Sequence, residues 1–288
     1  MRLIYPKAIT LDSSTIAANS DGYSEWSSGT TYAIGNMVMV TTVEPHKIYE
    51  SLADSNTNNP PAATPLKWQD QGGTNRWKMF DGFLDTQSSA ATSIEVEINA
   101  SNCDRLMLFN LDALQVDVEL TDETAAAVVY TETYDLSLTS GLYKQSLIER
   151  IPIIANATLK ITIGYASGTA KCGYCAAGWS TYIGLTRWGV TPTIVDYSVK
   201  ATDGFGYTYL SQGAFANNID VDVLIDYGDI DNVFEDLTSA RGTIVGIEAN
   251  ESGTDYQSLR GLGFPRYWKI GIDNPVKNIC RIEFQGVI

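Results

Sequence analysis

Short runs of alternating hydrophobic and polar residues recur along most of the chain. In the clearest runs every second side chain is apolar and the side chains between are mostly charged or carry a hydroxyl group; these runs span residues 93–98, 114–120, 158–163 and 219–225. Because successive side chains of a β-strand point to opposite faces, the pattern predicts half-buried antiparallel strands. Weaker patterns predict further strands at 105–109, 126–131, 194–200, 205–213, 243–249, 266–272 and 278–286.

One segment, Asp229 to Ala240, has the periodicity of a helix instead. Its apolar side consists of Ile230, Val233, Phe234 and Leu237. Acidic residues in its first turn suit the helix dipole, and the Arg241-Gly242 pair is typical of a helix end. The sequence therefore predicts a mainly β chain with one short helix at about 229–240.

The order of these elements divides the chain into four parts. Residues 1–20 are expected to form an N-terminal arm or a strand that leads into the fold. Residues 21–74 are expected to form a small aromatic β domain that ends in a linker at Gln71-Gly72-Gly73-Thr74. Regularly spaced strands then predict an antiparallel β-sandwich or jelly roll over 75–200, and a β-rich extension of that sandwich over 201–288 that contains the helix.

Charge and composition exclude several classes of function. The chain has 288 residues with 34 acidic and 19 basic side chains, a net charge of −15 that disfavours contact with a nucleic-acid backbone or anionic lipid. His46 is the single histidine, so zinc sites with two or three histidines are excluded, and any catalytic triad would depend on this one imidazole. No run of about 18 apolar residues predicts a membrane span, and the N-terminus lacks a signal-peptide pattern. We expect synthesis in a reducing cytoplasm.

The four cysteines are too few and too scattered to predict a disulfide framework. They are Cys103, Cys172, Cys175 and Cys280. Cys172-Gly-Tyr-Cys175 has the spacing of a redox pair, but the glycine-rich, aromatic continuation does not predict the helix that such a pair needs. The favoured interpretation is buried thiols in or beside a strand, with a redox pair and a four-cysteine zinc site as alternatives.

An acidic stretch from Asp220 to Asp236 lies in a segment without Lys or Arg between Lys200 and Arg241. Calcium prefers carboxylate ligands, which makes Asp226, Asp229 and Asp231 candidate ligands. The EF-hand spacing is absent, and the alternative is a solvated strand face followed by acids at a helix N-terminus. Paired carboxylates can also hydrolyse a glycan, but no particular pair is indicated. No catalytic residue is assigned, no nucleotide or zinc-protease motif is present, and no cofactor is expected.

Residues 21–74 carry the most specific motif. It consists of Trp26-x-x-Gly29-x-x-Tyr32-x-x-Gly35-x-x-Val38, then Tyr49-Glu-Ser, Asn58-Asn-Pro60 and a closing Trp68. This pattern resembles the chitin-binding modules of carbohydrate-binding families 5 and 12, which are three-stranded β units with exposed aromatic rings that stack on sugars. The resemblance implies that Trp26, Tyr32, Tyr49 and Trp68 bind a saccharide. Physical reasoning leaves the alternative that the same rings form the core of a small domain.

The segment Asn75-Arg-Trp-Lys-Met-Phe-Asp-Gly82 follows this module directly. Together with Gly184–Gly189, Asp196–Lys200 and Asp203–Gly206, it resembles a type of bacteriophage virion protein of the tail and neck, over most of residues 26–210. Arg76, Trp77 and Phe80 are expected to pack at the junction between the module and the sandwich, with the Arg76 guanidinium paired to a carboxylate.

The resemblance and the lack of a catalytic constellation predict a non-enzymatic structural protein of a bacteriophage virion, in the tail, baseplate or neck. Such a protein would assemble as a ring of identical copies and contact other virion proteins. The alternatives are a glycan-binding attachment protein that contacts host-surface polysaccharide through the N-terminal module, and a depolymerase. We expect the chain to be made in the host cytoplasm and built into the virion, with no sequence-specific nucleic-acid partner and no membrane insertion.

Overall fold

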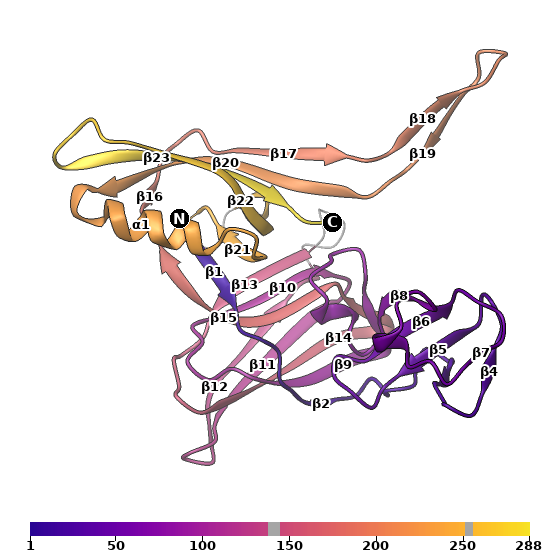
Figure 1. Cartoon of the computed structure of the whole chain (residues 1–288). Helices are drawn as coiled ribbons and strands as arrows, with labels where there is room; N and C mark the ends of the chain where they lie inside the picture. The colour runs from indigo at the N-terminus through magenta and orange to yellow at the C-terminus, as the bar shows by residue number, and fades with distance from the viewer. Residues whose placement is uncertain (138–144, 251–255) are drawn as a thin grey trace.

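The computed structural model describes residues 1–137, 145–250 and 256–288. Two large antiparallel sheets form the body, a small β module lies beside them, and a long β-hairpin projects away (Figure 1). The described part contains one α-helix, α1 (Ile230–Ser239), preceded by a 3-10 turn η3 (Tyr227–Asp229). The prediction of a mainly β chain with one short helix near the C-terminus is confirmed.

The smaller sheet of the body has five strands and contains three of the four clearest alternating runs. In spatial order these strands are β12 (Ala127–Asp135), β11 (Gln115–Asp122), β14 (Ala157–Cys172), β9 (Ser88–Asn99) and β2 (Leu11–Ser14). Their alternate apolar side chains, such as Val96, Val118 and Ile161, face one side of the sheet and are buried. Alternation along the sequence thus becomes one covered and one solvated face, as expected for antiparallel strands.

The larger sheet has ten strands. Its first half consists of β13 (Gln145–Arg150), β10 (Arg105–Leu111), β15 (Tyr174–Tyr182) and β1 (Arg2–Pro6). Its second half consists of β21 (Val245–Glu248), β22 (Arg260–Gly271), β23 (Lys277–Gly286), β20 (Phe215–Asp226) and β16 (Leu185–Thr186), with β17 (Thr191–Asp196) also paired to β20. A 3-10 turn, η4 (Gln257–Leu259), precedes β22.

The first half of the large sheet packs on the five-stranded sheet. Their shared core contains side chains of both layers, among them Val96, Leu108 and Ile161, and this is the two-layer sandwich that the sequence predicts. The second half has its own core, in which Val233 and Leu237 of α1 pack with side chains of β20, β21 and β23.

Residues 1–20, expected as an arm or a leading strand, are part of both sheets. β1 lies between β15 and β21 and so joins the two halves of the large sheet, while β2 pairs with β9. Leu3 and Ile4 are fully buried. The β-rich segment beyond residue 201 therefore continues the large sheet through β1.

The small module contains four strands in one sheet, where the resemblance implied three. They are β3 (Ser24–Glu25), β5 (Met37–Val40), β6 (Lys47–Ser51) and β8 (Trp68–Gly73), and the fourth, β3, is a two-residue strand parallel to β5. A separate short ladder joins β4 (Thr31–Tyr32) to β7 (Asn56–Thr57), and a 3-10 turn η1 (Pro61–Ala63) precedes β8. The prediction of a linker at 71–74 is wrong, because Gly73 is the buried last residue of β8 and pairs with Lys47 of β6.

Candidate functional site

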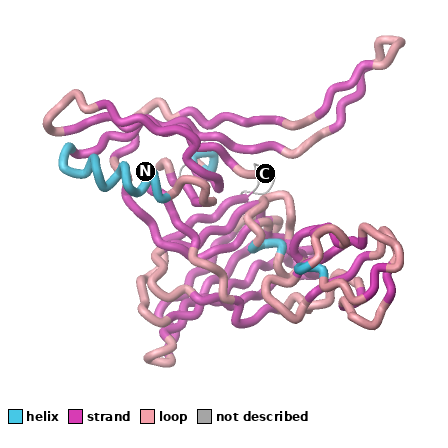
Figure 2. The backbone as a smooth tube through the Cα atoms, in the orientation of Figure 1, coloured by secondary structure: helices cyan, strands magenta, loops and turns pink. Residues whose placement is uncertain are grey.

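The hairpin that projects from the body is the most distinctive surface of this protein, and we call residues 191–214 the arm. Its base is β17, which pairs with the first half of β20. Its outer part is a two-stranded ribbon of β18 (Val199–Thr202) and β19 (Thr208–Ser211). Within the described residues β18 and β19 pair only with each other, and the backbone trace shows the ribbon extending well beyond both sheets (Figure 2).

Two strands that the sequence predicts in this region, at 194–200 and 205–213, differ from the strands of the arm. The run at 194–200 is interrupted by an elbow at Tyr197-Ser198, and the run at 205–213 begins within a tip at 203–207, so that only Thr208–Ser211 of it form a strand. Aspartate side chains bond to backbone amides at both places, which competes with strand pairing.

At the elbow, Asp196 and Ser198 hold the chain in a bend. The Asp196 carboxylate accepts hydrogen bonds from the Ser198 amide (2.9 Å) and from the Ser198 hydroxyl (2.6 Å), and the Ser198 hydroxyl oxygen accepts one from the Gly213 amide (3.0 Å). The Tyr197 amide donates to the carbonyl of Ala214 (3.0 Å). A Cβ at Gly213 would overlap the Tyr197 carbonyl, so the close crossing of the two strands requires glycine here.

At the tip, the Asp203 side chain organises the turn. Its Oδ1 accepts hydrogen bonds from the Phe205 and Tyr207 amides, both at 2.9 Å, and its Oδ2 accepts one from the Tyr209 hydroxyl at 3.2 Å. Partial desolvation opposes ionisation of Asp203, but the amides of Tyr207 and Phe205 outweigh it and lower the pKa of the carboxyl group. The tip is therefore a defined loop that presents Phe205.

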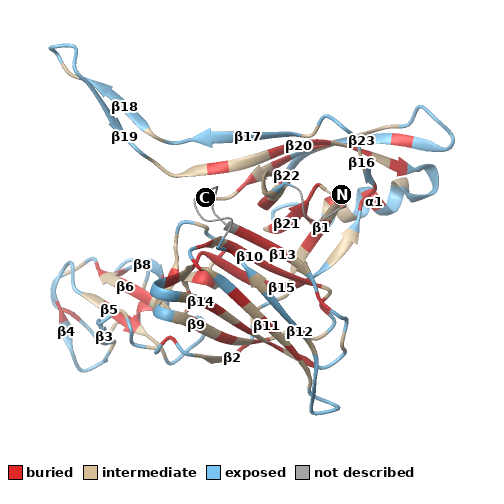
Figure 3. Cartoon of the chain, turned by 180° about the vertical axis from the view of Figure 1, so that it is seen from behind, coloured by how far each residue is buried: buried red, intermediate tan, exposed pale blue. Residues whose placement is uncertain are grey.

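The arm exposes an unusual number of large apolar side chains. Phe205 is 90% exposed and Leu210 78% exposed, and the other exposed members are Ile194, Val195, Tyr197, Val199, Tyr207 and Tyr209. Seen from behind, β17, β18 and β19 are almost entirely in the exposed colour (Figure 3). A two-stranded ribbon alone is at best marginally stable in water, and contiguous exposed apolar side chains usually mark an interaction site.

An apolar groove lies near the start of the arm. It is lined by Leu185, Trp188, Val190, Pro192, Leu259 and neighbouring residues, has a volume of about 570 Å³, and includes the guanidinium-bearing Arg187. Trp188 is fully exposed beside it. The groove adjoins β16, which pairs with Val223 and Leu224 of β20, whereas the arm continues from the opposite end of the same strand.

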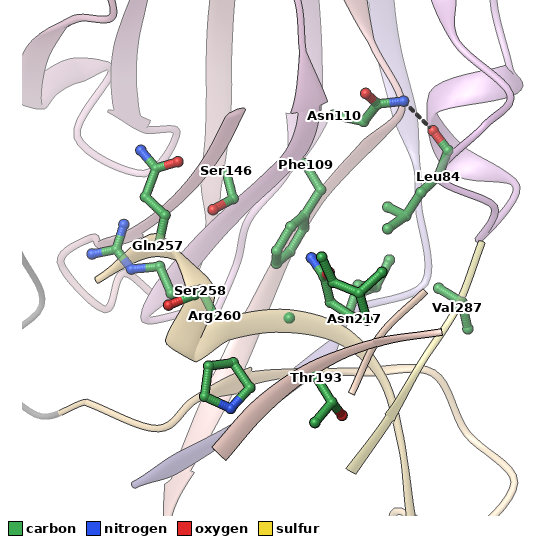
Figure 4. Close-up of a pocket in the computed structure, with 14 residues that line it drawn as sticks. Leu84, Phe109, Asn110, Ser146, Thr193, Asn217, Gln257, Ser258, Arg260 and Val287 are labelled. Atoms are coloured by element: carbon green, nitrogen blue, oxygen red, sulfur yellow. Dashed lines mark hydrogen bonds between the residues drawn. The ribbon is translucent and has the colours of Figure 1, made fainter. Parts of the chain in front are cut away.

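A smaller cavity of about 160 Å³ lies where the arm base meets the body (Figure 4). Phe109 and Ser146 approach it from β10 and β13, Asn217 from β20, Gln257 from η4 and Arg260 from the start of β22. The Oε1 atom of Gln257 is buried without a hydrogen-bond partner in the described part of the chain. Polar lining and small size suit a few ordered water molecules.

The aromatic rings assigned to sugar binding form the core of the module. Tyr32, Tyr49 and Trp68 are buried, Trp26 packs against them half-buried, and the Tyr32 and Trp68 rings meet edge to face at 5.2 Å between centroids. Trp68 Nε1 donates to the Asn59 carbonyl (2.9 Å). A sugar-stacking platform needs open ring faces, which Tyr32, Tyr49 and Trp68 do not offer.

The three junction residues lie between the module and the sandwich. Trp77 is 5% exposed in the sandwich core, with ring centroids 5.7 Å from both His46 of the module and Phe80 in η2 (Lys78–Phe80). Burial, and then the nearby Arg76 charge, lower the pKa of His46. Arg76 Nε is buried without a hydrogen-bond partner within the described ranges.

Hydrogen bonds tie the same junction together. The Asn75 amide donates to the Asp21 carboxylate (2.9 Å), and the Asn75 side chain both accepts from the Ser89 amide and donates to the Ser89 carbonyl, each at 2.8 Å. These bonds connect Asp21, the first residue of the module, and Asn75, which directly follows the module, with β9 of the sandwich. The module is therefore fixed to the body at its C-terminal end.

All four cysteines are free and buried. Burial raises the pKa of Cys172 and Cys280 to about 12 and that of Cys103 to about 11, so these thiols stay protonated at neutral pH. Cys172, Cys175 and Cys103 belong to the sandwich core, while Cys280 belongs to the core under α1. The structure therefore favours the interpretation of buried thiols in strands over a four-cysteine zinc site.

The acidic stretch of β20 is paired with basic residues of β23. Arg281 Nε lies 2.9 Å from Asp222 Oδ1, and Lys277 Nζ lies 3.0 Å from Asp226 Oδ1. The hydrogen bond from Arg281 lowers the pKa of Asp222. Residues 1–137, 145–250 and 256–288 contain no group of three or more His, Cys, Asp or Glu side chains that could hold a metal ion. Asp226, Asp229 and Asp231 are therefore not grouped around a common point in those ranges, and Lys277 of the neighbouring strand pairs with Asp226.

Comparisons with known proteins give no relative: no family model, no curated protein and no solved structure matches the chain. In the described ranges, no helix has the length and apolar character needed to cross a bilayer.

The sequence analysis predicted two ordinary strands in the arm, but the sequence does contain a signal for its elbow and tip. Aspartates at 196 and 203, each followed within two residues by Ser or Gly, mark the elbow and the tip.

Proposed function

We propose that this chain is a non-enzymatic structural subunit of a bacteriophage virion, in the tail, baseplate or neck, that assembles through its arm. The observation that carries the proposal is the arm itself, which presents large apolar side chains on an ordered ribbon beyond the body. The virion context rests on the sequence resemblance over residues 26–210.

Interface burial is the mechanism of such a subunit. The body is held by three separate buried clusters and by a continuous ten-stranded sheet, so it is a firm base from which the arm extends. An arm that reaches a neighbour's different surface makes heterologous contacts, and repeated heterologous contacts close into a ring when the rotation allows. Burying the arm in a neighbour also removes the unpaired ribbon edges from solvent.

The test is incorporation into particles. Cells that produce the phage are supplied with the wild-type chain, or with a variant in which a short Gly-Ser turn replaces residues 198–213. Purified virions should contain the wild-type chain by mass spectrometry and should lack the arm-deleted variant. A variant with the exposed turn 123–126 between β11 and β12 replaced in the same way should still be incorporated. Absence of the wild-type chain from virions overturns the proposal.

A further inference from the structure

We propose that the arm's partner is a second copy of this chain, with Phe205 of one copy seated in the apolar groove beside Trp188 of the next. This inference rests on the proposed assembly function and names its contact. Phe205 is the side chain that enters the groove, because it is 90% exposed on a loop whose conformation is already fixed by hydrogen bonds to Asp203. Such preorganisation reduces the entropy cost of binding.

The groove has the size and chemistry to accept an aromatic side chain. Its volume of about 570 Å³ lies in the range of sites that enclose small organic ligands, and Leu185, Val190 and Leu259 give it apolar walls. Trp188 stands fully exposed at its side, where a second aromatic ring can pack against it. An exposed tryptophan beside an apolar groove is typical of the centre of an interface.

A copy of the chain does not reach its own groove. The groove lies at the Val223–Leu224 end of β20, and the arm leaves from the Phe215 end of that strand. The outer ribbon then leads further away, about 3.3 Å per residue. Tip and groove therefore lie far apart on one copy, separated by the length of β17 and of the outer ribbon, which is the arrangement of a head-to-tail contact between copies.

Charge favours this part of the surface for self-association. Two copies of a chain with net charge −15 repel each other, but residues 191–214 carry only Asp196, Lys200 and Asp203. The basic Arg187 of the groove lies 4.0 Å from the Asp222 carboxylate, and the described residues that line the groove include no acid, so the acidic Asp203 of an incoming tip meets no like charge in that lining. The contact thus joins the low-charge arm to a groove with a positive side chain.

The area is sufficient for a stable contact. Exposed aromatic side chains offer about 150–250 Å² each, so covering the exposed rings and aliphatic side chains of the outer arm removes on the order of 600 Å² on the arm's side. A standard interface buries about 800 Å² per partner, so the outer arm supplies most of that area, and Ile194 and Val195 of β17 are exposed as well.

Cysteine cross-linking tests the contact directly. Copies with Gly204→Cys, at the tip beside Phe205 where a Cβ meets open space, are mixed with copies carrying Leu185→Cys in the groove, under mild oxidation; the native cysteines are buried and do not interfere. A disulfide should join the two variants in solution. The control acceptor is Val128→Cys on β12, which is 51% exposed but lies on the other sheet and should cross-link far less.

Sedimentation provides the second readout. Phe205→Ala should raise the dissociation constant of self-association at least about 30-fold, the effect of losing an interface anchor. Leu66→Ala, which removes an equally exposed side chain from the module, should leave it unchanged. A monomeric wild-type chain, or equal cross-linking to Cys at 185 and 128, overturns the inference. If the chain nevertheless enters virions, the proposed function stands and only the partner is wrong.

Discussion

Aromatic side chains gather in two regions of this chain, the module of residues 21–74 and the arm, and the two regions use them in opposite ways. In the module, Tyr32, Tyr49 and Trp68 turn inward and are at most 7% exposed. In the arm, Phe205, Tyr207 and Tyr209 are at least 61% exposed.

The difference depends on whether a second layer covers the rings. In the module, the four-stranded sheet and the short ladder of β4 and β7 lie against each other, so that their rings meet in a common core. The arm is one ribbon with solvent on both faces, and nothing in the described chain covers it. The same residue types therefore stabilise the fold in one place and remain available for association in the other.

The largest expected effect is the loss of Trp68 from the module. Trp68→Ala should lower the free energy of unfolding by about 3–5 kcal/mol, because it leaves a cavity among Tyr32, Val38 and Tyr49. Chemical denaturation followed by near-ultraviolet circular dichroism measures the change. An unchanged unfolding midpoint would mean that the ring is not a core residue, and the contrast with the arm would fail.

The next effect concerns the elbow of the arm. Gly213→Ala forces a Cβ onto the Tyr197 carbonyl and should lower the stability of the ribbon by about 1–3 kcal/mol. Amide hydrogen exchange in residues 199 to 211 should become faster as a result. Gly204→Ala at the tip is the matched control, since a Cβ there meets open space. Equal exchange rates in the two variants would show that the elbow is not held by this close approach.

The tip should respond to acid. Because its hydrogen bonds lower the pKa of Asp203 in the folded loop, the stabilisation of the tip is fully present above the unfolded pKa of about 4 and is lost as the pH falls through the lower folded value. Amide exchange or nuclear magnetic resonance shifts of Phe205 and Tyr207 report the change. Asp203→Asn should remove this pH dependence, while the module's amides should show none of it.

The smallest effect on stability is expected at Phe205, the exposed ring at the tip of the arm. Phe205→Ala should change the free energy of unfolding by less than about 0.5 kcal/mol, because its side chain contacts mainly water in the single subunit. Thermal denaturation of dilute protein measures this. A loss comparable to that of Trp68→Ala would show that Phe205 is a folding residue and would remove the distinction between the two regions.

Much of the fold was predictable from local pattern. Apart from Leu114, the runs at 93–98, 114–120, 158–163 and 219–225 lie in strands, and the helical face from Ile230 to Leu237 lies in α1. These predictions succeed because burial of one face places apolar side chains at a period of 2 along a strand and of 3.6 along a helix. This period does not depend on which element packs against the buried face.

The candidate site was less predictable, because its character depends on what lies opposite each residue. Nothing in the order of residues shows that Arg281 and Lys277 would neutralise Asp222 and Asp226 from a strand more than 50 positions away. Likewise, glycines at 72 and 73 read as a linker, although backbone pairing to β6 makes them the end of a strand.

The sequence by itself determined the β class and the single helix, since these follow from the side-chain period. Only the tertiary structure decided which aromatic rings are buried and which are exposed. Exposure depends on whether a second layer covers a given strand face, and that layer comes from distant parts of the chain. A ring in the module and a ring in the arm look alike in sequence, but only the first has such a layer.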